Sequence, residues 1–136
     1  MPQTISIPGP SANDDADPAP VLVCERLDCY RLALGFQSAA FRVLSNRRIG
    51  SNLRDQLDRA STSIALNIAE GAGRSASRDK AQFFAIARGS AVECAAVFDV
   101  LVARGLVPAF DHREARGLLV RIVQMLTRLI ARQRIE

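Results

Sequence analysis

The chain has 136 residues, of which 49% are apolar and 5% aromatic, and it carries a formal net charge of +4. This length is enough for one core built from aliphatic side chains. No apolar run approaches the roughly 20 residues that a membrane span needs, and the first residues lack the basic and apolar pattern of a secretory signal. The three cysteines are an odd number, so a disulfide framework is not indicated. We therefore expect a soluble, cytoplasmic protein.

Residues 1–20 differ in composition from the rest of the chain. They hold five of the six prolines and three acidic residues, Asp14, Asp15 and Asp17, but no Lys or Arg. Because they also lack a periodic apolar pattern, we predict a disordered or loosely attached tail. Residues 21–136 then form the folded domain, with 18 basic residues against 11 acidic ones and a net charge of +7. A basic body of this kind can attract nucleic acid or an acidic partner.

The first predicted helix covers residues 23–44 and is apolar on two sides. One row consists of Leu27, Tyr30, Leu34, Gln37, Phe41 and Leu44, and the other of Leu32, Phe36, Ala39 and Val43. A helix that is apolar on two faces needs more than one partner surface.

The second predicted helix follows a turn at residues 46–51 and reaches Glu70. Ser51 or Asn52 is suited to cap its N-terminus. Gly71 and Gly73 come directly after the last periodic residue, where glycine commonly ends a helix. The inner face is predicted to carry Leu57, Ser61, Ile64 and Ile68 together with Leu53.

The third predicted helix covers residues 78–104, with Ser77 as its cap and Gly105 as its stop. Its apolar seam consists of Phe83, Ala87, Ser90, Cys94, Val97 and Leu101, at alternating steps of four and three. Gly89 costs about 1 kcal/mol relative to Ala in the middle of a helix, which suggests that it has a packing role.

The fourth predicted helix follows Pro108, with Asp111 as its cap. Its inner stripe is predicted at Ala115, Leu118, Ile122, Met125 or Leu126, and Leu129, and it is widened by Leu119, Val123 and Ile130. Four helices with short connections predict an all-α fold, an antiparallel up-and-down four-helix bundle.

Basic residues gather at two connections between the helices. Arg47 and Arg48 share the first connection, Arg74, Arg78 and Lys80 surround the second, and Arg88 lies about two turns along the third helix. In an up-and-down bundle these connections lie at opposite ends. Each group is either a solvated surface or a nucleic-acid contact. With one Tyr and no Trp to stack on bases, such contacts should be made to phosphates and should depend strongly on salt.

Catalytic and metal-binding patterns are weak. His112 is the only histidine, the spacing of Cys24 and Cys29 fits paired metal ligands poorly, and Cys94 lies on the apolar seam, where we expect buried packing. No nucleophile and base are paired by spacing. We predict that the protein is not an enzyme and holds no metal or cofactor.

The second helix carries a motif that points to a family. Residues 53–71 contain Arg59-Ala60, Ser63-Ile64 and Asn67-Ile68-Ala69-Glu70-Gly71, and the third helix contains Ile86-Ala87-Arg88-Gly89-Ser90 followed by Glu93. Over roughly residues 23–133 the chain resembles the family of proteins encoded in intervening sequences of large-subunit ribosomal RNA genes. Relatives in that family are accessory proteins of diversity-generating retroelements. The resemblance implies a homopentamer and, for the retroelement relatives, binding to nucleic acid and to a reverse transcriptase.

We interpret the motif residues mainly as structural, and the set is Arg59, Ser63, Asn67, Glu70, Gly71, Gly89, Ser90 and Glu93. Arg59 and Glu93 are predicted to form an interhelical ion pair, because a partly buried charge without a partner is costly. Asn67 and Glu70 are predicted to bind backbone groups at the end of the second helix. Two functions remain open: an oligomeric adaptor that binds nucleic acid, and a purely structural or protein-interaction assembly.

Overall fold

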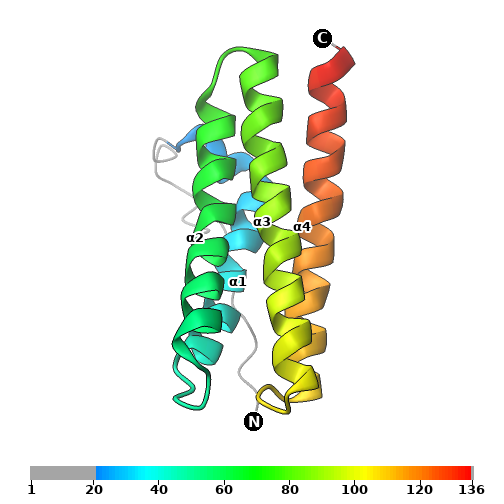
Figure 1. The fold of residues 1–136 in the computed structure, drawn as a ribbon. Helices are drawn as coiled ribbons and strands as arrows, with labels where there is room; N and C mark the ends of the chain where they lie inside the picture. The colour runs from blue at the N-terminus through cyan, green and yellow to red at the C-terminus, as the bar shows by residue number, and fades with distance from the viewer. Residues whose placement is uncertain (1–20, 136) are drawn as a thin grey trace, which may run out of the picture.

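The computed structural model describes residues 21–135, which form one short 3₁₀ helix and four α-helices. The elements are η1 (Val23–Arg26), α1 (Asp28–Leu44), α2 (Ser51–Gly73), α3 (Ser77–Ala103) and α4 (Ala109–Ile135). The α-helices run alternately up and down (Figure 1), which confirms the predicted all-α four-helix bundle. None of them is long and apolar enough to cross a membrane. The predicted tail, residues 1–20, lies outside the described residues.

The bundle has two ends with different connections. The α1–α2 and α3–α4 connections meet at one end, and the α2–α3 connection lies at the other, together with the start of α1 and the last turns of α4 (Figure 1). We call these the α1–α2 end and the α2–α3 end. The first helix is the shortest, with 17 residues against 23 in α2 and 27 in α3 and in α4.

One of the two predicted rows on α1 forms the core, and the other does not. Leu32, Phe36 and Val43 are buried, and the ring of Phe36 packs against that of Phe98 with the centroids 5.9 Å apart. On the other row Phe41 is 70% exposed. The second row is therefore only partly covered within the protomer, with Leu34 and Leu44 half-buried against the core. The helix also starts later than predicted, because Leu27 has an extended backbone between η1 and α1.

The inner faces of α2 and α3 lie largely where the apolar pattern predicts them. Leu57, Ser61, Ile64 and Ile68 are all buried on α2. On α3 the seam is correct at Ala87, Cys94, Val97 and Leu101, whereas Phe84 replaces Phe83 as the buried ring. The buried residues of the α4 stripe are Ala115, Leu119, Ile122, Leu126 and Ile130. Of the two alternatives, Leu126 rather than Met125 is the core residue. Leu118 and Leu129 lie at the margins of the stripe, and Leu119 and Ile130, predicted only to widen it, lie at its centre.

Three helix starts differ from the predicted caps, and one of them is that of α3, which begins at Ser77 with Ala76 in the N-cap position. Helix α2 begins at Ser51 with Gly50 in the N-cap position, and no side chain caps it. Helix α4 begins at Ala109, where Pro108 O accepts the bond from His112 N–H at 3.1 Å. Asp111 therefore lies within the first turn, where its negative charge still interacts favourably with the positive end of the helix dipole.

Gly105 ends α3 as predicted. Its φ of +70° is left-handed, a conformation that glycine adopts without steric cost. The N–H of Gly105 donates to Val102 O at 3.0 Å, and the N–H of Leu106 donates to Leu101 O at 2.9 Å. This pair of hydrogen bonds defines a Schellman motif, which satisfies carbonyls at the helix end.

Gly71, by contrast, does not end α2, because the helix continues to Gly73. Gly71 is buried, and a Cβ added to it would lie 2.8 Å from Cε1 of Phe84 and 3.2 Å from Cβ of Phe83. The glycine is therefore a point of close approach between α2 and α3. The prediction of a helix stop at this position is wrong by about one turn.

Candidate nucleic-acid interface

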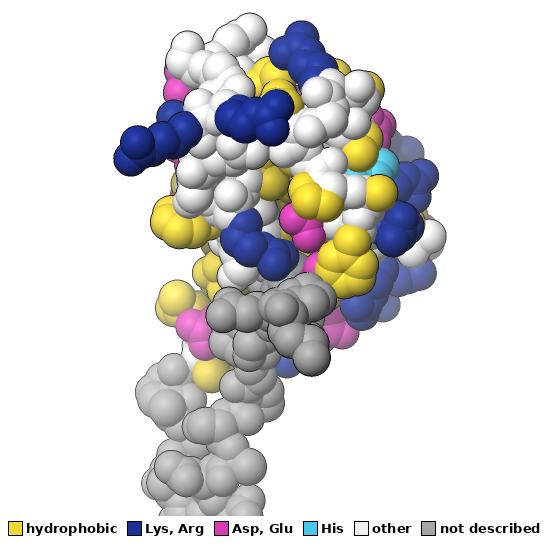
Figure 2. All heavy atoms as spheres, turned by 90° about the horizontal axis from the view of Figure 1, so that it is seen from below, with side chains coloured by type: hydrophobic (Ala, Val, Ile, Leu, Met, Phe, Trp, Pro, Cys, Tyr) yellow, Lys and Arg dark blue, Asp and Glu magenta, His cyan; other side chains and the backbone are white. Residues whose placement is uncertain are grey.

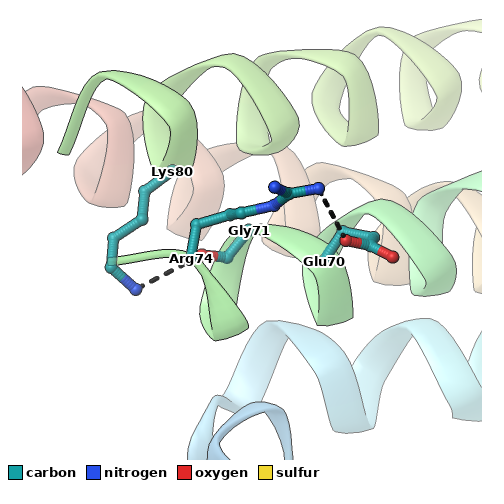
Figure 3. A network of polar contacts seen from close by, with 4 residues as sticks. All are labelled: Glu70, Gly71, Arg74 and Lys80. Carbon is teal, nitrogen blue, oxygen red and sulfur yellow. Dashed lines mark hydrogen bonds and ion pairs between the residues drawn. The ribbon is translucent and has the colours of Figure 1, made fainter. Parts of the chain in front are cut away.

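The basic residues at the α2–α3 end are largely occupied by contacts within the protein. The ammonium of Lys80 donates to Gly71 O at 3.3 Å (Figure 3) and also to Ala72 O at 3.0 Å. The guanidinium of Arg74 pairs with Glu70 at 3.3 Å and lies 4.8 Å from the centroid of the Phe83 ring. Both side chains thus stabilise the end of α2 and its connection to α3.

Lys80 has the role that the sequence led us to expect for Asn67 and Glu70. A lysine near a helix C-terminus can bind the last carbonyls and complement the negative end of the dipole. Glu70 instead pairs with Arg74, and Asn67 turns back along its own helix toward Ser63. Asn67 thus binds a backbone carbonyl, but one within α2, and the prediction that Asn67 and Glu70 bind the groups freed at the end of the helix is wrong.

The two other basic residues of this group differ from each other. Arg88 donates to Thr127 Oγ1 at 3.3 Å and so links α3 to α4. Arg78 is exposed, and no ion pair within residues 21–135 includes it. Of the four basic residues predicted around the second connection and along α3, Arg78 is the one without such a contact in that range.

The α1–α2 end presents its arginines to solvent. Arg47 and Arg48 are both exposed, and no ion pair in the described part of the chain includes either guanidinium. The connection beneath them is held in place, since Arg54 donates to Asn46 O at 2.9 Å and to Ile49 O at 3.3 Å. Arg47 and Arg48 are thus displayed from an ordered turn.

A further arginine at this end was missed by the sequence reasoning. Nδ2 of Asn46 donates to Leu106 O at 3.2 Å, which joins the α1–α2 and α3–α4 connections. Arg104 is the C-cap residue of α3 and begins the α3–α4 connection, so it lies at the same end as Arg47 and Arg48. Like them it is exposed. Basic side chains are visible across this end in Figure 2. The signal was available, because the first and third connections of an up-and-down bundle share an end.

Three of the motif residues form a polar network between α2 and α3. The hydroxyl oxygens of Ser63 and Ser90 are 2.9 Å apart, and Nδ2 of Asn67 donates to Ser63 Oγ and to Ser63 O, each at 2.9 Å. All three side chains are half-buried. The network fixes which residues of the two helices face each other.

The predicted Arg59–Glu93 ion pair is wrong. Both side chains are exposed, and the ion pairs formed by residues 21–135 include neither of them. The prediction assumed partial burial, which would make an unpaired charge costly. In water that cost is absent, and an exposed pair gains about 0–1 kcal/mol, so nothing forces the two groups together.

Gly89 does not have the packing role that we predicted within the protomer. A Cβ added there would meet no atom within 4 Å. It lies on a row of exposed residues that we call the outer α3 stripe, composed of Ala85, Ile86, Gly89, Val92, Ala96 and Val100. Val92 is 56% exposed and Ile86 45%. Helix α3 is therefore apolar on its outer side as well as toward the core, which is typical of a helix with a second partner surface.

Two features of residues 21–135 bear on catalysis and metal binding. His112 Nε2 lies 2.7 Å from Asp99 Oδ1, but no group of three or more His, Cys, Asp or Glu side chains suited to a metal occurs in the described part of the chain. Burial raises the pKa of Cys29 to about 11 and that of Cys94 to about 12, which disfavours the reactive thiolate. Cys94 is fully buried, which confirms its predicted packing role.

Fold and surface together define a small helical bundle with exposed arginines at one end and an uncovered apolar stripe. Residues 25–128 match the 23S rRNA-intervening sequence protein family, and the chain belongs to that family. The resemblance found in the sequence is thereby confirmed for the ribosomal RNA branch. No curated protein matches the chain.

Proposed function

We propose that the protein is a non-catalytic homo-oligomer, a pentamer, that binds the phosphate backbone of RNA or DNA and acts as an adaptor. The observation that carries the proposal is the group of exposed arginines at the α1–α2 end, namely Arg47, Arg48 and Arg104. In a closed ring this group is repeated once in each copy. Individually weak contacts then add up when one nucleic acid spans several copies.

Self-association is supported by the outer α3 stripe. Its side chains gain by leaving water, at roughly 25 cal/mol for each Å² of apolar surface buried. Because Gly89 and Ala96 are small, a second helix could approach the backbone of α3 closely. The number of five copies comes from the family resemblance.

The arginines of the α1–α2 end are better suited to a ligand than Arg74 and Lys80. Those two already contact Glu70, Phe83 and helix carbonyls, so binding a phosphate would disrupt the end of α2. Within residues 21–135 no ion pair engages Arg47 or Arg48, and a guanidinium offers forked donors that match phosphate oxygens. Contacts of this kind position a nucleic acid without reading its sequence.

A titration of fluorescently labelled RNA and DNA at several salt concentrations tests the interface. We compare the natural chain with Arg47→Gln/Arg48→Gln, and with the matched control Arg59→Gln/Arg121→Gln, which removes the same charge from exposed helix positions. The first variant should bind more weakly, with the slope of log K against log salt reduced by about 1 for each phosphate that is no longer bound. The control should keep most of that slope. Equal weakening in both variants, or no binding at low salt by the natural chain, would contradict the proposal.

Light scattering after gel filtration tests the assembly. A pentamer has a mass of about 74 kDa, five times the 14.8 kDa of the chain. Ala96→Arg places a charge in the outer α3 stripe and should give a protomer, whereas Gln124→Arg, at an exposed position on α4, should leave the assembly intact. A natural chain that elutes as a monomer would contradict the self-association.

The second candidate is a structural or protein-interaction assembly without nucleic-acid binding, and the outer α3 stripe favours it equally. An intact pentamer that binds neither RNA nor DNA at low salt would support this candidate. For a gene within a retroelement, the partner we propose is a reverse transcriptase, and a cytoplasmic location is part of the same proposal. Co-purification with that enzyme, abolished in Arg47→Gln/Arg48→Gln, would identify the adaptor role.

A further inference from the structure

Arg59 and Glu93 are isolated charges on two adjacent helices. Both side chains are exposed, and the ion pairs within residues 21–135 include neither. Glu93 is the only charged residue of α3 between Arg88 and Asp99, and Arg59 is the only basic residue of α2 beyond Arg54. Each therefore offers one charge of defined sign beside the outer face of its helix.

The contacts between α2 and α3 fix the heights of these residues along the bundle. The two helices run antiparallel and side by side (Figure 1), and Ser63 Oγ lies 2.9 Å from Ser90 Oγ. Arg59 comes four residues before Ser63 on α2, and Glu93 comes three residues after Ser90 on α3. Because each residue advances a helix by about 1.5 Å, Arg59 and Glu93 lie at nearly the same height.

The apolar parts of the two outer faces also match in height. Leu66 is 62% exposed on α2. It comes three residues after Ser63, a step that corresponds on α3 to Ala87, next to Ile86 and Gly89. A Cβ added to Gly89 would meet nothing within 4 Å. The outer α3 stripe thus has a notch close to the height of Leu66.

We propose that the copies of the ring pack through two different faces, the outer α3 stripe of one copy and the outer face of α2 in the next. In a ring whose axis runs along the bundle, every copy has the same height and direction, so residues that are level within one protomer are also level across the contact. Leu66 of one copy then packs at Gly89 of its neighbour. At the edge of the same contact, Arg59 of the first copy pairs with Glu93 of the second.

The other helices are less suited to receive the outer α3 stripe. Phe41 is exposed on α1, but α1 and α3 lie diagonally across the bundle, and contact faces on opposite sides of a protomer extend a row of copies instead of closing a small ring. The exposed side of α4 carries arginines, and residues 111–134 expose no large apolar side chain. Helix α2 is the neighbour of α3, so its outer face points in a different but not an opposite direction.

This contact rests on the self-association in the proposed function, and crosslinking of the full chain tests it. In Arg59→Cys/Glu93→Cys, a short bismaleimide should join neighbouring copies into a ladder that extends to five chains on a denaturing gel. The control Arg59→Cys/Gln124→Cys moves the second thiol to an exposed position on α4 and should give no ladder. The natural chain, whose three cysteines are buried, should not react. Crosslinks confined to single chains, or a ladder that stops at two chains, would overturn the proposal.

Charge reversal tests the ion pair. Arg59→Glu and Glu93→Arg should each raise the protein concentration at which the assembly dissociates in light scattering by about tenfold, because like charges then meet across the contact. Arg59→Glu/Glu93→Arg should restore the natural value, and Arg59→Gln, which creates no repulsion, should leave the assembly intact. Both side chains are exposed in the protomer, so circular dichroism should show the same helix content in every variant.

The outcomes separate this contact from the proposed function. An assembled natural chain that both single reversals leave unaffected, or a double reversal that fails to restore assembly, would overturn the contact and leave self-association in place. A natural chain that is monomeric in light scattering would contradict both.

Discussion

Replacing Gly71 by alanine tests whether the close approach of α2 and α3 is a real constraint. The added methyl group would lie 2.8 Å and 2.9 Å from two ring carbons of Phe84, which is 2% exposed. Overpacking of this kind costs about 1–3 kcal/mol. The substitution also gains about 1 kcal/mol, because alanine favours a helix more than glycine does.

The matched control is Gly117→Ala, in the exposed face of α4, where an added Cβ would meet no atom within 4 Å. This variant receives the helix gain without the overlap, so it should be more stable than the natural chain by up to about 1 kcal/mol. The difference between the two variants isolates the steric cost, and we expect it to be about 1–3 kcal/mol. Urea unfolding at one fixed protein concentration measures it, since oligomers gain apparent stability with concentration.

A second substitution identifies the source of the cost. Phe84→Leu removes ring atoms from the overlap, so Gly71→Ala should cost less in that background, with a coupling energy of about 1 kcal/mol in the double-mutant cycle. Equal stabilities of Gly71→Ala and Gly117→Ala would refute the reasoning, because Phe84 would then have room to move.

Three further predictions concern the thiols and the helix ends. Cys29 and Cys94 have raised pKa values when folded, about 11 and about 12 against 9.0, so their contribution to stability is complete below pH 9 and is lost as the pH rises toward 11–12. At pH 10 the free energy of unfolding should be lower by roughly 1 kcal/mol per thiol than at pH 7.5, and a variant with alanine at both positions should lose this part of the dependence on pH. Gly105→Ala forces a side chain into a left-handed conformation and should cost about 1 kcal/mol in urea unfolding; a neutral result would mean that the backbone relaxes. Lys80→Met should lower the free energy of unfolding by about 1 kcal/mol, because Ala72 O then loses the Lys80 donor and Gly71 O keeps only the N–H of Arg74, whereas Arg78→Met, at an exposed neighbouring position, should have no effect.

The fold could be predicted because the apolar periodicity of α2, α3 and α4 identifies each helix and its buried face. Errors of a few residues at the helix ends do not change this result. Leu57, Ile64 and Ile68 occupy the core as their spacing indicates. On α1 the pattern contained two apolar rows, and spacing alone cannot rank them. The structure buries the row that contains Phe36, because its ring meets Phe98, a contact between residues 62 positions apart.

The candidate site was only partly predictable. A basic residue near a helix end looks the same in sequence whether its side chain contacts the protein itself or is exposed to solvent and ligands. Lys80 and Arg47 are such a pair: the first binds carbonyls of α2, and the second is exposed. The difference depends on how α3 leaves its turn and brings Lys80 over the end of α2, which sequence spacing does not specify. Arg104 was predictable from the sequence, because the first and third connections of an up-and-down bundle share an end.

Lys80 is the only lysine in the sequence, and this has a practical consequence. Reagents that couple to primary amines, such as succinimidyl esters of dyes or of biotin, can modify a side chain at this position alone. The modified nitrogen would lose its charge and keep a single N–H, in place of the ammonium that donates to the carbonyls of both Gly71 and Ala72. Immobilisation through amines would therefore damage the hairpin between α2 and α3, and attachment through an added peptide tag is the safer way to tether this protein.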